Sequence, residues 1–163
     1  MDRFKDYGIK EDIEILGIIS LVCSVMGNGK HNNAKVMLEE TIRSETQLGA
    51  FPDNNDTYGE GLGQFDKPTF VDVLQRTKPK DKMLVAKHFG IDLTNVYYSE
   101  LRKNPILAIL MVRLKYKLIE EEFPTTKEAR YHYYKRYYNS ASGKADLKHY
   151  LESNKNTFFR GGV

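Results

Sequence analysis

The chain has 163 residues, of which 40% are hydrophobic and 29% are charged, a composition typical of one soluble globular domain. Its only cysteine, Cys23, has no partner for an internal disulfide, so the sequence excludes a disulfide-stapled scaffold. The formal net charge is +3, but residues 1–100 hold 12 Lys and Arg against 16 Asp and Glu, whereas residues 101–163 hold 13 against 6. This basic C-terminal part suits an anionic partner, either a cell-wall polymer or a nucleic acid.

Hydrophobic residues recur at helical spacing along most of the chain, so we expect a single, mainly α domain over residues 1–163. The pattern predicts helices at about 10–26, 33–46, 69–75, 81–89, 95–103, 106–123, 125–138 and 145–153. Asn104 is the expected N-cap of the most apolar helix, and Thr125 or Thr126 is the expected cap of the one after it. We expect residues 154–163 to form a flexible tail.

The longest apolar run, from Ile15 to Met26, is too short to span a bilayer, and several acidic residues precede it. It therefore lacks the positively charged start of a secretory signal, and we interpret it as a buried first helix. We expect neither a signal peptide nor stable insertion into a membrane.

Residues 49–66 are rich in Gly, Asn and Asp and contain a proline, so they are expected to form a long polar loop or a short hairpin.

The helix predicted before this loop, at 33–46, carries three glutamates, and their positions around the helix axis differ. Its apolar stripe consists of Ala34, Met37, Leu38, Thr41 and Ile42. Glu45 continues this stripe at helical spacing, whereas Glu39 and Glu40 lie off its centre. Glu39 is expected to form a solvated helical pair with Arg43.

Glu45 is thus the one glutamate that we expect to point inward, at the end of its helix. Partial burial and the negative end of the helix dipole should both raise the pKa of its carboxyl. A carboxyl that stays protonated near neutral pH can protonate a departing glycosidic oxygen.

The motif Glu45-Thr46, followed by a loop and by Gly61-Leu62-Gly63-Gln64, resembles the Glu-Ser and Gly-Leu-Met-Gln pattern of soluble lytic transglycosylases and goose-type lysozymes. Thr46 stands where these proteins have serine, and Gly63 stands where they have methionine. Tyr138-Asn139 is similar to the centre of their later Ala-Tyr-Asn-Ala-Gly motif, although the glycine comes later here. The resemblance covers about residues 33–151. It implies an α+β lysozyme-like fold in which the long loop or hairpin forms one wall of the substrate cleft.

The resemblance also implies an activity, which is cleavage of the β-1,4 bond between N-acetylmuramic acid and N-acetylglucosamine in peptidoglycan glycan strands. Glu45 would be the general acid and then the base, and the Tyr138 hydroxyl would hold its carboxyl in position. The residues implied in substrate binding are Thr46, Gly61, Leu62, Gly63, Gln64 and Asn139.

A second carboxylate would decide between the two reactions that this family catalyses. Inverting hydrolysis needs a carboxylate that holds a water opposite the acid, and Asp56 and Asp66 are the candidates implied by goose-type lysozymes, with Asp53 also in the loop. Loop aspartates more often serve as turn or cap residues. We therefore favour the lytic transglycosylase reaction, with a hydrolytic muramidase as the alternative.

Residues 82–103 offer a different interpretation, because they resemble a helix-turn-helix with a glycine at the turn. Ser99 stands where the second helix should bury an apolar residue, and the exposed positions Tyr97 and Tyr98 are not basic. We therefore rank DNA binding well below the enzyme.

The four histidines show no metal-ligand spacing, and the glycine-rich stretch 59–63 lacks the lysine of a phosphate loop, so we expect no metal and no nucleotide cofactor. A lysozyme-like domain without a signal peptide or wall-binding module is expected to be a bacteriophage or prophage product, either an endolysin or a virion component. Such a protein would need delivery from the host cytoplasm or virion to the cell wall.

Overall fold

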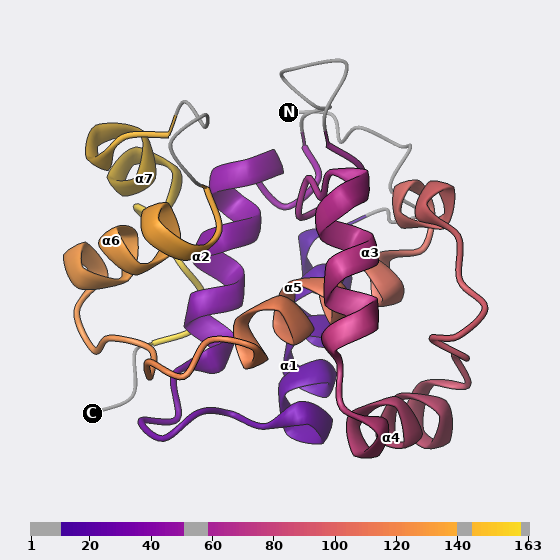
Figure 1. The fold of residues 1–163 in the computed structure, drawn as a ribbon. Helices are drawn as coiled ribbons and strands as arrows, with labels where there is room; N and C mark the ends of the chain where they lie inside the picture. The colour runs from indigo at the N-terminus through magenta and orange to yellow at the C-terminus, as the bar shows by residue number, and fades with distance from the viewer. Residues whose placement is uncertain (1–10, 51–58, 140–144, 161–163) are drawn as a thin grey trace.

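The helices follow one another with short connections in a computed structural model, which describes residues 11–50, 59–139 and 145–160 (Figure 1). They are α1 (Asp12–Met26), α2 (Ala34–Thr46), α3 (Lys67–Arg76), α4 (Pro79–Phe89), the 3-10 helix η2 (Tyr98–Arg102), α5 (Pro105–Lys117), α6 (Lys127–Tyr137) and α7 (Leu147–Ser153). The prediction of a mainly α fold is confirmed. Within the described ranges there is no β-strand, only one antiparallel bridge between Glu60 and Phe65.

Side-chain caps fix several helix starts where polar residues precede apolar runs. The Asn104 side chain accepts a hydrogen bond from the Leu107 N–H, and Thr126 caps α6 in the same way. The start of α3 differs from the helix expected at 69–75, because Asp66 is its N-cap. Its carboxylate accepts the Thr69 N–H at 2.8 Å, which moves the helix start to Lys67.

The helix after Asn104 is shorter than predicted, because α5 ends at Lys117 instead of continuing to Phe123. Three consecutive glutamates, residues 120–122, would have extended its C-terminal end, where the helix dipole disfavours negative charge. Lys117 instead bonds to the Met26 carbonyl at 3.2 Å and pairs with Asp81 at 2.9 Å, which holds this helix end against α1 and α4.

Helix α5 occupies the middle of the molecule and contacts α1, α2, α3 and η2. Figure 1 shows α6 and α7 on one side of α2, and α3 and α4 on the opposite side of the molecule. Nine of the thirteen residues of α5 are buried, so this helix is the centre of the core. None of the helices in the described part of the chain is long and apolar enough to cross a membrane.

The segment 60–65, which we call the glycine turn, belongs to the described part of the long polar loop. Reciprocal backbone hydrogen bonds of 2.9 and 3.1 Å between Glu60 and Phe65 close it. Gly61 has φ +77°, and a Cβ atom there would lie 2.6 Å from the Leu101 carbonyl oxygen, so only glycine fits this position. The turn is thereby pressed against the end of η2.

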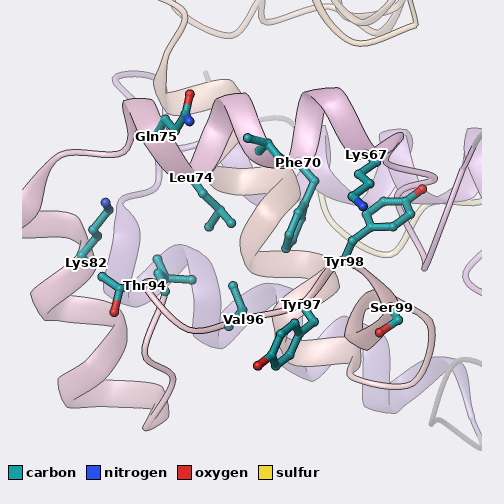
Figure 2. Close-up of a pocket in the computed structure, with 12 residues that line it drawn as sticks. Lys67, Phe70, Leu74, Gln75, Lys82, Thr94, Val96, Tyr97, Tyr98 and Ser99 are labelled. Atoms are coloured by element: carbon teal, nitrogen blue, oxygen red, sulfur yellow. The ribbon is translucent and has the colours of Figure 1, made fainter.

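A shallow groove of about 650 Å³ lies between α3, α4 and the segment 93–99 (Figure 2). We call it the α3–α4 groove. Its apolar lining comes mainly from Phe70 and Leu74 of α3 and from Val96 opposite them. Glu45 is not among its lining residues.

Candidate active site

Glu45 lies one residue before the C-terminal end of α2 and is partly buried. Its carboxylate accepts a hydrogen bond from the Tyr134 hydroxyl and a longer one, 3.4 Å, from the Asn139 side-chain amide. Both partners come from α6 and the residues just after it, about 90 positions later in the chain. The expected inward direction of Glu45 therefore agrees with the structure.

Burial raises the pKa of the Glu45 carboxyl above its ordinary value, because the surroundings disfavour the anion. The hydrogen bonds from Tyr134 and Asn139 act in the opposite direction on this pKa, as do the positive charges of Lys115 and His149. The net effect is a carboxyl that keeps its proton to higher pH than an exposed glutamate. This property is what a general acid requires.

The glycine turn is fastened directly to the end of α2. The Thr46 hydroxyl donates to the Leu62 carbonyl at 2.9 Å and accepts the Gly49 N–H at 3.1 Å. Leu62 is fully buried, backbone included, so it supports the turn and is not exposed to a substrate in this structure. Thr46 therefore connects the helix that carries Glu45 to the glycine turn by hydrogen bonds.

The turn is fastened on its other side to the end of α6. The Tyr138 hydroxyl donates to the Gly63 carbonyl at 2.6 Å, and the Tyr138 ring meets the Phe65 ring edge-on at 5.9 Å. Gln64 has a left-handed φ of +52°, and its side-chain amide donates to the Gly61 carbonyl at 3.0 Å. Three sequence motifs that are far apart in the chain thus meet around Glu45.

The role expected for Tyr138 requires a correction. Its hydroxyl holds the glycine turn, and the hydroxyl that contacts Glu45 belongs to Tyr134, one helical turn earlier. The two rings stack at 5.9 Å on the same face of α6. Periodicity could have suggested Tyr134, since positions i and i+4 share a helix face, but it could not have separated the two roles.

Lys115 of α5 is a further residue of this site that sequence reasoning missed. Its ammonium lies 4.2 Å from the centre of the Tyr138 ring and 5.7 Å from that of Phe65, and it donates to the Tyr138 carbonyl at 3.4 Å. Burial lowers the pKa of Lys115, while the negative charges of Asp66 and Glu45 raise it. Lys115, whose ammonium lies over aromatic rings, therefore adds a positive charge that acts on the Glu45 carboxyl.

The candidate second carboxylates are placed differently. Asp66 is exposed, and one of its carboxylate oxygens serves as the N-cap of α3. Asp56 and Asp53 lie outside the described residues. Asn139, for which we expected a role in substrate binding, contacts Glu45 and accepts a hydrogen bond from Lys135 at 3.0 Å.

Gly63, which stands where the resembling families have methionine, has a structural reason to be glycine. A Cβ atom at this position would lie 2.5 Å from the Tyr138 hydroxyl oxygen and 2.6 Å from the Val112 side chain. We expect Gly63→Ala to lower the free energy of unfolding by about 1–3 kcal/mol, the usual cost of overpacking. Adding Tyr138→Phe should recover part of this loss by removing the closest atom. Urea denaturation of these two variants and of the unchanged protein measures the loss of stability. Equal stability of Gly63→Ala and the unchanged protein would contradict the prediction.

The other two glutamates of α2 are buried, contrary to the expectation from helical phase. Glu39 and Glu40 are both 0% exposed. Glu39 does bond to Arg43 at 2.8 Å, but this pair is not solvated, because the carboxylate also accepts the N–H groups of Phe158 and Phe159. Both glutamates are buried because the C-terminal segment, which includes Tyr150, Phe158 and Phe159, bonds to them on a second face of α2.

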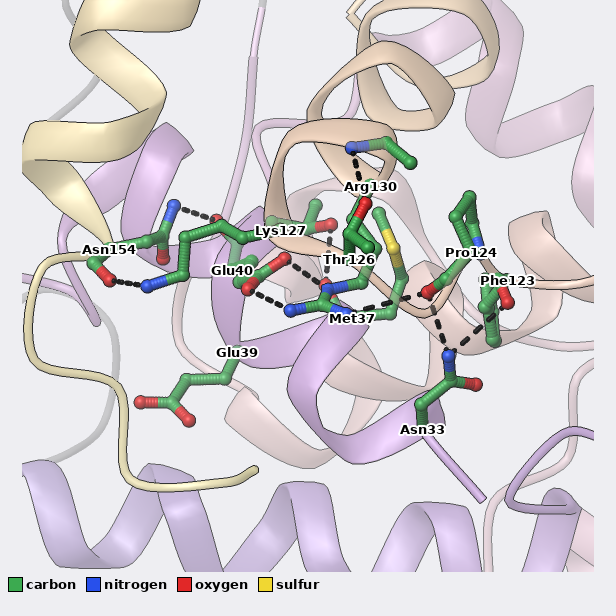
Figure 3. A network of polar contacts seen from close by, with 12 residues as sticks. Asn33, Met37, Glu39, Glu40, Phe123, Pro124, Thr126, Lys127, Arg130 and Asn154 are labelled. Atoms are coloured by element: carbon green, nitrogen blue, oxygen red, sulfur yellow. Dashed lines mark hydrogen bonds and ion pairs between the residues drawn. The ribbon is translucent and has the colours of Figure 1, made fainter. Parts of the chain in front are cut away.

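Glu40 is the centre of a buried polar network (Figure 3). Arg130 of α6 forms two hydrogen bonds to its carboxylate, at 2.8 and 3.0 Å, and the Tyr150 hydroxyl donates a third at 2.6 Å. Asn154 is also fully buried, and its carbonyl accepts the Lys127 ammonium at 2.6 Å. Within residues 154–160, for which we expected a flexible tail, Asn154 bonds to α2 and α6, and the N–H groups of Phe158 and Phe159 bond to Glu39. Residues 161–163 lie outside the described part.

The possible helix-turn-helix at 82–103 has only its first helix and its turn. Helix α4 ends at Gly90, which has the left-handed φ of +66° that such a turn needs. The second element is η2, a 3-10 helix of five residues, where a DNA-reading α-helix would be required.

No cluster of three or more His, Cys, Asp or Glu side chains that could hold a metal ion occurs among the residues that the structure describes. Comparison of the chain with models of protein families, with curated proteins and with solved structures found no match.

Proposed function

We propose that this protein is a lysozyme-like enzyme that cleaves the β-1,4 bond between N-acetylmuramic acid and N-acetylglucosamine in peptidoglycan. The observation that supports this proposal is the meeting of three motifs at one carboxyl. Glu45, the glycine turn and the end of α6 are joined by the hydrogen bonds of Thr46 and Tyr138. The proposal includes an α+β lysozyme-like cleft with the polar loop as one wall.

The proposed reaction begins with the protonated Glu45 carboxyl, which donates its proton to the glycosidic oxygen as the bond to the sugar carbon breaks. Positive charge develops on the sugar ring, and the Glu45 carboxylate left behind can stabilise it. The carboxylate then takes the proton of the 6-hydroxyl of the same sugar. That oxygen attacks the ring carbon and closes a 1,6-anhydro ring, which leaves Glu45 protonated for the next cycle.

The transglycosylase reaction is favoured over hydrolysis because it needs one carboxyl rather than two. Asp66, the candidate within the described residues, already uses a carboxylate oxygen to cap α3. A capping carboxylate is held by the helix that it starts, which leaves it poorly suited to orient a water. Hydrolysis with Asp56 or Asp66 is the alternative. We propose a bacteriophage endolysin or virion component as the biological setting.

The test is mass analysis of the fragments released from purified peptidoglycan. Anhydro ends make each fragment lighter than the hydrolytic product by the mass of one water, which supports the transglycosylase, whereas reducing ends support the muramidase. Asp66→Asn tests whether a second carboxylate is needed, and this variant should remain active if Glu45 acts alone. An intact fold with no cleavage at any pH would reject the proposed function.

The Tyr134 hydroxyl provides a prediction about pH. Tyr134→Phe removes a hydrogen bond that stabilises the Glu45 carboxylate, so the pKa of Glu45 should rise further. Because cleavage requires the protonated acid, activity is lost as pH rises through this pKa, and the variant should keep its remaining activity to higher pH. We expect the maximal rate to fall about 10- to 150-fold, since a hydrogen bond to a charged group contributes about 1.5–3 kcal/mol.

The measurement is the pH dependence of the cleavage rate, followed by the clearing of a peptidoglycan suspension. Tyr137→Phe is the control, because it removes a hydroxyl from the same helix that bonds instead to Glu121 at 3.4 Å. An alkaline limb of the Tyr134→Phe profile that stays in place or moves to lower pH would contradict the assigned role.

A further inference from the structure

The α3–α4 groove is a second feature that a ligand could occupy, and it is independent of Glu45. Its floor is apolar, with Phe70 and Leu93 largely buried beneath it. Two apolar side chains on its walls remain open to solvent, Val71 at 41% and Tyr97 at 64% exposure. Exposed apolar side chains that line one depression are typical of a surface that binds a partner.

The charged residues that line the groove are both lysines. Lys82 of α4 and Lys67 of α3 lie at its two opposite ends, and no acidic residue lines it (Figure 2). The segment 67–90, which forms α3 and α4, contains six Lys and Arg against two Asp. Both aspartates are engaged within the protein, because Asp72 pairs with Arg76 and Asp81 pairs with Lys117. A ligand matched to this surface is therefore apolar in its middle and negatively charged toward its ends.

We propose that the α3–α4 groove is a docking site for a short segment of a partner protein that carries apolar side chains flanked by carboxylates. The apolar side chains would cover Phe70, Leu74 and Val96, and the carboxylates would pair with Lys67 and Lys82. The apolar floor provides the area to be buried, and the lysines fix the orientation of the segment and favour acidic partners over others.

A nucleic acid fits this groove less well than an acidic peptide does. Binding to the phosphate backbone depends on many lysine and arginine contacts, and only two of the groove's twelve lining residues are cations. The remaining lining is mostly apolar, and the neighbouring η2 is too short to enter a DNA groove.

The test uses a fluorescein-labelled peptide in which two leucines and a phenylalanine are flanked on each side by two glutamates. Fluorescence polarisation with the complete chain should show saturable binding. A peptide with glutamine in place of every glutamate should bind clearly less well, and one with serine in place of the apolar residues should not bind. Lys67→Gln and Lys82→Gln should each weaken binding about twofold to fivefold, the range of a partly exposed ion pair.

Val71→Asp places a carboxylate in the groove at an exposed position, so it should abolish binding without unfolding the protein. Met83→Asp is the matched control, because Met83 is an exposed apolar residue of α4, at 72%, that does not line the groove. Equal binding of the glutamate and glutamine peptides, unchanged binding by Val71→Asp, or no binding at about 1 mM peptide would overturn the proposal. Displacement of the peptide by a double-stranded DNA oligonucleotide, with a steep dependence on salt, would instead assign the surface to nucleic acid.

Discussion

Replacing Glu45 by glutamine should lower the rate of peptidoglycan cleavage by at least about 10²–10⁴-fold, the contribution of a positioned general acid or base. Glutamine has nearly the same shape and can still accept the Tyr134 hydrogen bond, but it has no proton to give to the glycosidic oxygen. The clearing of a peptidoglycan suspension and the quantity of released fragments measure the loss. Glu152→Gln is the control, because Glu152 is an exposed glutamate on α7.

The same substitution should change stability in a way that an ordinary structural glutamate would not. Because the pKa of Glu45 is raised in the folded protein, the folded state binds this proton more tightly than the unfolded state does. The stability contributed by this carboxyl is therefore complete below its unfolded pKa and is lost as pH rises through its folded pKa. Above that pKa, Glu45→Gln should be more stable than the unchanged protein in urea denaturation.

Activity that survives in Glu45→Gln would remove Glu45 from the reaction. A variant that loses activity and is also destabilised at neutral pH would indicate that the carboxyl supports the fold rather than the chemistry. Urea denaturation at several pH values, performed beside the activity assay, therefore separates the two roles.

Glu40→Gln should be the most destabilising of the conservative substitutions in α2, lowering the free energy of unfolding by about 3–5 kcal/mol. The substitution leaves the Arg130 guanidinium buried, at 4% exposure, without its carboxylate partner. Since a domain is typically stable by only about 5–15 kcal/mol, the variant should be marginal at room temperature. Urea denaturation at low temperature measures the loss.

A double variant distinguishes the ion pair from its surroundings. Glu40→Gln combined with Arg130→Met removes both charges and should be more stable than the sum of the two single losses implies. A loss below about 1 kcal/mol for Glu40→Gln alone would contradict the assigned role, because it would mean that the network in Figure 3 contributes as little as a surface pair.

Most helices could be predicted from the sequence because their boundaries are encoded locally. Asn104 and Thr126 cap helices whose start lies within three residues of the capping side chain, as expected. The predicted length of α5 was too great, because its early end depends on contacts of Lys117 with α1 and α4. The predicted helix at 95–103 was also too long, since the structure has only the 3-10 helix at 98–102. This segment contacts the glycine turn, where the Tyr98 hydroxyl donates to the Phe65 carbonyl at 2.7 Å.

The candidate site could be predicted in outline but not in its contacts. The motifs around Glu45, Gly61–Gln64 and Tyr138-Asn139 were each visible as short patterns. That Tyr134 rather than Tyr138 meets the carboxyl depends on how α6 is rotated against α2. The role of Lys115 could not be predicted from the sequence, because a lysine near the end of a helix is normally solvated.

The three glutamates of α2 show which properties could be predicted from the sequence and which depend on the tertiary structure. The sequence by itself determined that this segment is a helix and that Glu45 lies at its end on the apolar side, because helical periodicity and end signals depend on neighbours a few positions away. Only the tertiary structure decided that Glu39 and Glu40 are buried as well, since the groups that satisfy them belong to Phe158 and to Arg130, about 90 to 120 positions away. The burial of a charged side chain depends on what packs over it, and a partner that distant leaves no periodic mark on the helix.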